Sequence, residues 1–475
     1  MKSFKKNLIT SLKSYVLVVF SLPIILNSGY NFFQKFIELN LDKFNFSKIV
    51  SFILGSLFFV FLSNFLNNKF LFGGRSVALV FYLTSYFVFD SVLLFIGKYI
   101  SFNLSFLIVT SFWCFLALFK TKNFLEILKI ASLFSVYRIF NTFFFEDLIN
   151  NSNFKELNTD VPAQWLDLAT MIYEYNYFYA LENNIIEGQG LLPSYIQALM
   201  LKIGFQAETF QFIQINSYLF LTFSILLITD LKISKKDKLI SSVLFVAIVS
   251  NNNWLEYLLI NSLMIEGIVS FLISVYLYNF LQMYKNKNWS SFLFFLSFGA
   301  MVLTKNFVSL ISLIIIVFSI ALLKRNIFLI GGVIVYSLNL IYQQIYFSQL
   351  QNFAYTSNID FKDLLYDFIF FRDLDLQKIG DIIDQFLIDK PTTYLVIVFM
   401  LVNLFTLVKF GINFNTNNLM FAFVMLNYIL VNLLYISIWK NIEFESSYRY
   451  IISCFHIIFV SIVINLSSFE KTNKF

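Results

Sequence analysis

Long apolar runs, separated by short polar segments, constrain the fold of this chain more than any other feature. The runs lie at about 12–28, 49–66, 76–97, 101–119, 127–145, 210–229, 239–253, 257–283, 291–304, 307–323, 326–347, 392–408, 418–438 and 449–467. Because a helix of roughly 20 apolar residues crosses a bilayer, the pattern predicts an all-α, polytopic transmembrane bundle of about 14 spans. The two shortest runs, 239–253 and 291–304, are typical of tilted, broken or re-entrant segments.

The composition excludes the main soluble classes. Of the 475 residues, 59% are hydrophobic and 13% are charged, whereas a soluble domain carries roughly 25% charged residues. A soluble enzyme, a nucleic-acid binder and a disordered protein are therefore excluded. Cys114 and Cys454 both lie in apolar runs, so we expect no disulfide framework and no metal site built from them.

The charges predict the orientation of the spans. If both termini are cytoplasmic, 20 of the 34 basic residues fall in short inner segments, as the positive-inside rule requires. Under the same orientation, 24 of the 28 acidic residues lie outside or within the membrane. Many of these acids belong to two long outer loops, about 146–209 and 348–391. Long acidic loops on one face are typical of a surface that carries binding or catalytic residues. The alternative is a chance accumulation of acids in these loops.

No internal repeat or flexible linker divides the chain, but its halves differ. Residues 1–125 hold four predicted spans with short loops and few acids. Residues 126–475 contain both long outer loops. We therefore predict a four-span N-terminal extension, 1–125, followed by a membrane core, 126–475.

The outer loops contain signals for helices at the membrane surface. Asp160 stands where a helix N-cap is expected, followed by Pro162, and apolar residues then recur at helical spacing to about residue 182. This predicts an amphipathic interfacial helix over about 161–182. Pro193 and Ser194 mark the start of a second short helix. In loop 348–391 aromatic residues alternate with aspartates, which again predicts an interfacial segment.

Four sequence features occur in one order along the core. They are Arg138 in a span that precedes the outer loop opened by Asp160, then Gly190-Leu191-Leu192-Pro193-Ser194-Tyr195, then Gly299-Ala300-Met301-Val302-Leu303-Thr304-Lys305, and finally Tyr448-Arg449-Tyr450-Ile451-Ile452 at the start of the last span. Together, over about 127–467, they resemble the GT-C glycosyltransferases, a group that includes protein O-mannosyltransferases and the lipid A aminoarabinose transferase. Three departures are that Asp160 lacks an adjacent acid, that no large soluble C-terminal domain follows, and that the four N-terminal spans are not part of the family's minimal pattern.

The resemblance implies an enzyme that transfers a sugar from a polyprenyl-phosphate carrier to an acceptor at the non-cytoplasmic face. It implies Asp160 as the catalytic base, because a carboxylate can take the proton of an acceptor hydroxyl. Asp167 lies seven residues later, two helical turns on and on a similar face, and is the second candidate for the base or a metal ligand. The resemblance also implies Arg449 and Lys305 as contacts of the lipid phosphate, since guanidinium and ammonium groups bind phosphate. The expected location is a bacterial inner (plasma) membrane with both termini cytoplasmic. The acceptor (lipid, glycan or protein) and the sugar stay open.

Ionisable residues inside spans need a partner or a function, because each costs on the order of 3 kcal/mol there. Arg138 and Glu266 are such residues, and we assign both to substrate binding, with a buried ion pair as the alternative. Asp90 is similar but lies in the extension and receives no role. Asp373-Leu374-Asp375 matches the D-x-D metal motif of soluble sugar transferases. Because eight aspartates are scattered through this loop, we expect a chance match and predict no metal site. A divalent cation stays open as a cofactor. The single histidine, His456, is expected to pack within its span.

Two other classes compete with this interpretation. A polysaccharide (O-antigen) polymerase or ligase also has about a dozen spans, but such enzymes use loop arginines, and here the second loop has only Arg372. A lipid-linked sugar flippase or other transporter would place its essential charges in mid-span and often shows repeated halves. Essential acids in the outer loops would favour the transferase.

Overall fold

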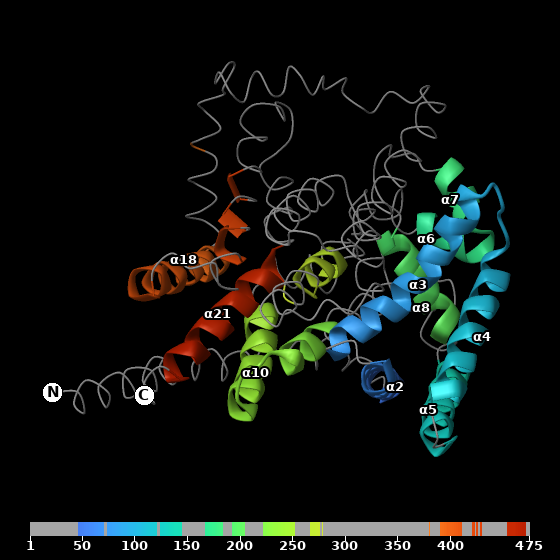
Figure 1. Cartoon of the computed structure of the whole chain (residues 1–475), viewed down its shortest axis with the longest axis horizontal. Coiled ribbons are helices and arrows are strands. Elements are labelled where there is room, and N and C mark those ends of the chain that lie inside the picture. The colour runs from blue at the N-terminus through green and yellow to red at the C-terminus, as the bar shows by residue number, and fades with distance from the viewer. Residues whose placement is uncertain are drawn as a thin grey trace. The chain divides into compact units, whose positions relative to one another are not determined.

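The computed structural model describes residues 46–70, 74–120, 124–144, 167–183, 192–204, 222–251, 267–275, 390–410 and 454–471, with a few isolated residues, among them 278, 380 and some of 420–429. Every regular element in these segments is a helix (Figure 1). The helices are α2 (Phe46–Phe70), α3 (Arg75–Phe95), α4 (Phe102–Lys120), α5 (Phe124–Phe144), α6 (Asp167–Glu174), α7 (Tyr177–Glu182), α8 (Leu192–Gly204), α10 (Lys235–Asn251), α18 (Lys390–Phe410) and α21 (Phe455–Lys471). The predicted all-α class is confirmed for this part of the chain.

Two of these helices are long and apolar enough to cross a membrane: Arg75–Leu93 within α3 and Phe102–Phe119 within α4. Shorter apolar helices cover Val396–Val408 and Phe455–Asn465. One face of α4 is exposed although it is apolar, with Phe115 64% and Phe119 79% accessible. An apolar face open to solvent is costly in water and favourable in lipid, so these helices support membrane association.

The chain folds as two compact units. The larger unit comprises Ser47–Leu226 and Leu259–Leu374, and the smaller comprises Met1–Phe46, Leu227–Leu258 and Asp375–Phe475. Within the larger unit α3 packs against α4 and α8, and α6 packs against α8 (Figure 1). Within the smaller unit α18 lies beside α21, and α10 also contacts α21.

A glycine ends α3 and turns the chain toward α4. Gly97 has φ = 71°, in the left-handed region where a Cβ is disfavoured. The amide of Lys98 donates to the carbonyl of Leu93 at 2.8 Å, which is the six-to-one hydrogen bond of a Schellman C-cap. The cap stops α3 at Phe95, so α4 can begin seven residues later and run back alongside it.

Two contacts join neighbouring segments at the ends of the long helices of the larger unit. At one end, Lys69 in the last turn of α2 and Glu126 in the first turn of α5 form an ion pair of 2.8 Å. At the other end, the amide of Phe102 donates to the carbonyl of Tyr175 at 3.0 Å. The two contacts hold neighbouring segments of the larger unit together at these two ends.

A second glycine allows close approach of α2 and α5. A Cβ on Gly55 would lie 3.0 Å from Cε2 of Tyr137, and the Tyr137 ring is buried against Phe58. We expect Gly55→Val to lower the free energy of unfolding by about 1–3 kcal/mol, because the rigid tyrosine ring must shift. Thermal unfolding in detergent measures this. Leu57→Val, on the exposed face of α2, is the control and should change the free energy by less than about 0.5 kcal/mol; equal effects would contradict the close-contact explanation.

Candidate functional site

The structure describes the predicted site residues unequally. Asp167 is exposed and is the first residue of α6. Arg138 lies in α5, but its side chain is outside the described residues. The remaining predicted site residues, Asp160, Glu266, Lys305 and Arg449, also lie outside the described residues. Their predicted roles therefore stay predictions.

Asp167 is the first residue of α6, and this helix determines where its carboxylate lies. An acid in the first turn is stabilised by the positive end of the helix dipole. The apolar face of α6, formed by Leu168, Ala169 and Ile172, is buried, and α6 packs against α8. Burial of this face leaves Asp167 on the open side, where its carboxylate is accessible to a ligand.

The predicted helix over 161–182 is wrong as one continuous element. Its described part forms two helices, α6 and α7, separated at Tyr175 and Asn176. The side chain of Asn176 caps α7 by accepting from the amide of Tyr179 at 2.7 Å, and the backbone of Asn176 is extended. An asparagine that caps a helix competes with continuation of the preceding helix. The apolar stripe predicted a helix on the membrane surface. In α6 this stripe is buried, and α6 packs against α8.

A buried carboxylate joins the loop helices to the membrane helices. Asp90, in α3, is 6% exposed. One of its oxygens accepts from Ser105 of α4 at 2.5 Å, and the other accepts from Tyr195 of α8 at 2.6 Å. Hydrogen bonds to a carboxylate are stronger than neutral ones, so they offset much of the cost of burying Asp90.

Aromatic rings enclose the hydroxyl that binds Asp90. The Tyr195 ring meets Phe87, Phe102 and Tyr177 edge-on, with centroid distances of 5.4, 5.5 and 6.0 Å. Edge-to-face contacts of this kind are favourable and directional. Burial, and next the neighbouring Asp90 carboxylate, raise the pKa of Tyr195 well above its ordinary value. Tyr195 therefore stays protonated, and its hydroxyl donates to Asp90 and, at the longer distance of 3.3 Å, to the carbonyl of Tyr86.

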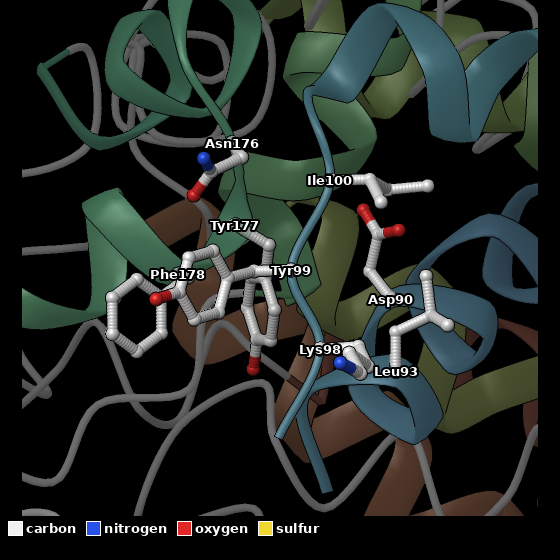
Figure 2. A pocket seen from close by; sticks show the side chains of 8 residues that line it. All are labelled: Asp90, Leu93, Lys98, Tyr99, Ile100, Asn176, Tyr177 and Phe178. Atoms are coloured by element: carbon white, nitrogen blue, oxygen red, sulfur yellow. The ribbon is translucent and has the colours of Figure 1, made fainter. Parts of the chain in front are cut away.

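A small pocket opens beside this carboxylate, where the turn after α3 meets α7 (Figure 2). It is lined by Asp90, Leu93, Lys98, Tyr99, Ile100, Asn176, Tyr177 and Phe178. Its cavity volume of about 10 Å³ leaves room for about one water molecule. The pocket therefore cannot take a sugar or a lipid phosphate, and Asp90 does not face a substrate cavity there.

Sequence reasoning missed the contribution of Asp90. Its signal was visible, because an aspartate in an apolar span is costly unless it is paired. The partner could not be inferred, since Tyr195 is 105 residues away in the sequence. Tyr195 itself belongs to the Gly190-Leu191-Leu192-Pro193-Ser194-Tyr195 motif. The structure thus connects one of the four family-like motifs to the predicted extension.

The smaller unit contains a separate polar cluster between α18 and α21. The side-chain oxygen of Asn403 accepts from Asn465 at 2.9 Å and from Ser461 at 3.3 Å, and all three residues are buried. Hydrogen bonds of this kind hold membrane helices together. His456 is buried in α21 beside Phe245, with ring centroids 5.5 Å apart, as a packed residue would be.

Metal ligands do not gather in the part of the chain that the structure describes. No three His, Cys, Asp or Glu side chains there could hold one ion.

Comparison of the whole chain with protein-family models, with curated proteins and with solved structures finds no match.

Proposed function

We propose that this protein is a membrane glycosyltransferase that transfers a sugar from a polyprenyl-phosphate carrier to an acceptor at the non-cytoplasmic face. The observation that carries the proposal is the order of four GT-C-like motifs between Arg138 and Ile452. The apolar composition, the helices of the described segments, and the exposed carboxylate of Asp167 on a short helix that contacts α4 support it.

The chemistry proposed for this site needs a base, cations and an apolar groove. Asp160 takes the proton of the acceptor hydroxyl while the hydroxyl oxygen attacks the anomeric carbon and the polyprenyl phosphate leaves. Asp167 is the second candidate for this role. Arg449 and Lys305 balance the charge of the leaving phosphate, and Arg138 and Glu266 bind substrate from within the membrane. A divalent cation remains a possible cofactor of this reaction.

The test of the function is a profile of cell-envelope glycans and glycolipids from a deletion strain. We expect one sugar to be missing from one product, and the wild-type gene to restore it. The missing product names the acceptor class, whether lipid, glycan or protein. Accumulation of an intact lipid-linked oligosaccharide would instead overturn the proposal in favour of a polymerase or a flippase.

We also propose an arrangement of about 14 spans in a bacterial inner (plasma) membrane, with both termini cytoplasmic. Lys98 and Lys236 are exposed in the structure, and this topology puts them on opposite sides of the membrane. An impermeant amine reagent applied to spheroplasts should label Lys98, whereas Lys236 should react only after lysis. Peptide mass spectrometry reports both sites in one sample. Labelling of Lys236 in intact spheroplasts would reverse the topology.

A further inference from the structure

Three helices from distant parts of the chain share one buried carboxylate. Asp90 belongs to α3, and its two hydrogen-bond donors, Ser105 and Tyr195, belong to α4 and α8. The Asp90 oxygens both have partners, and the neighbouring cavity has room for about one water. Each Asp90 oxygen therefore already binds a neighbouring helix, and the bond to Tyr195 holds the first turn of α8 against α3.

Further contacts attach the same loop helices to the ends of α3 and α4. The rings of Tyr99 and Phe178 stack at 4.5 Å with an interplanar angle of 9° (Figure 2). Near the other end of α8, the ammonium group of Lys202 donates to the side-chain oxygen of Asn103. Asp167 lies on α6, which packs against α8, so the position of α8 determines the position of this candidate base.

We propose that α3 and α4 form a seat for the outer-loop helices α6, α7 and α8, and that Asp90 is the positioning residue of this seat. Asp90 acts through its hydrogen bond to Tyr195, which fixes α8 and with it the acid-bearing helix α6. This inference assigns a role to part of the predicted N-terminal extension. Its effect on catalysis rests on the proposed function, whereas its effect on the loop does not.

The matched pair Tyr195→Phe and Tyr86→Phe tests the effect on activity. Both changes remove one hydroxyl from a largely buried tyrosine, but the described partners of the Tyr86 hydroxyl, Tyr82 and Thr110, lie within α3 and α4. We expect Tyr195→Phe to lower sugar transfer about tenfold at an unchanged amount of folded protein. A factor of ten corresponds to about 1.4 kcal/mol, within the range of a hydrogen bond to a charged acceptor. Tyr86→Phe should stay within about twofold, and equal rates for the two variants would overturn the role in positioning.

Asp90→Asn separates positioning from acid–base chemistry. The amide oxygen of asparagine can still accept from Tyr195, and its NH₂ group can donate to the hydroxyl of Ser105. We therefore expect Asp90→Asn to retain transfer within about threefold of the wild type. A loss of about 100-fold or more would instead show that Asp90 handles a proton, and would overturn the positioning role.

Cross-linking tests the seat without any assay of activity. Cysteines in place of Asn103 and Lys202, in a full-length chain whose Cys114 and Cys454 are replaced by alanine, should react with a short bismaleimide and join α4 to α8. Adding Tyr195→Phe should slow this cross-linking about tenfold, and adding Tyr86→Phe should not. Unchanged cross-linking in the Tyr195→Phe protein would overturn the seat. If the wild type transfers no sugar, the proposed function has failed, and the cross-linking rates alone decide whether the seat exists.

Discussion

Replacing Asp160 with asparagine is expected to lower sugar transfer by about 100-fold or more, because a general base contributes roughly 10²–10⁴-fold to a rate. Asparagine has nearly the same shape as aspartate but cannot accept a proton at neutral pH. Transfer is measured in membranes, with the variant protein present in the same amount as the wild type. If both Asp160→Asn and Asp160→Ala leave transfer intact in folded protein, Asp160 is not the base.

Asp167 provides a matched comparison for this experiment. Asp167 and Asp237 each lie in the first turn of a helix, α6 and α10 respectively, so each gains a similar stabilisation from the helix dipole. Only Asp167 lies on the predicted outer face. If Asp167 is the base, Asp167→Asn should show the 100-fold loss in place of Asp160→Asn, and Asp237→Asn should remain within about twofold of the wild type. Equal losses in the Asp167 and Asp237 variants would indicate destabilised helices rather than lost chemistry.

Asp90→Leu is expected to destabilise the protein more than Gly55→Val does. Leucine removes the acceptor of the buried Ser105 hydroxyl. It also removes the closer acceptor of the buried Tyr195 hydroxyl, which keeps only the Tyr86 carbonyl at 3.3 Å. Each lost hydrogen bond to a charged acceptor costs about 1.5–3 kcal/mol, so loss of both should lower the free energy of unfolding by about 3–6 kcal/mol. The yield of monodisperse protein in detergent and its unfolding temperature measure the loss.

Thr84→Val is the control for this variant. Thr84 is also buried in α3, and its hydroxyl donates to carbonyls of its own helix, Val80 at 2.8 Å and Phe81 at 3.3 Å. Valine keeps the shape of threonine and leaves no distant partner unsatisfied, so we expect a change of less than about 1 kcal/mol. If Asp90→Leu were as stable as Thr84→Val, the hydrogen bonds of Asp90 would not contribute to holding the three helices together.

The sequence predicted the helices of the described segments well because their signals are local. The apolar runs at 76–97 and 101–119 correspond to α3 and α4, and hydrophobicity over about 20 residues is sufficient to predict them. The ends were less certain. Gly97 adopts a left-handed conformation and so ends α3 at Phe95. The break between α6 and α7 depends on one asparagine cap, Asn176. Each of these is a choice between two local hydrogen-bonding patterns of similar free energy.

For the candidate site, too, the sequence identified single residues but not the contacts between them. The sequence alone singled out Asp167 as an acid in a predicted outer loop and Asp90 as an unexplained charge in a predicted span. It could not connect Asp90 with Tyr195, because a contact across 105 residues depends on how helices pack and not on any periodicity of the chain. Nor could it show that the apolar stripe of α6 packs against α8, since a bilayer and a neighbouring helix bury the same residues with similar gain. Hydrophobicity therefore determined which segments are helices, and only the tertiary structure decided which apolar faces and polar groups meet.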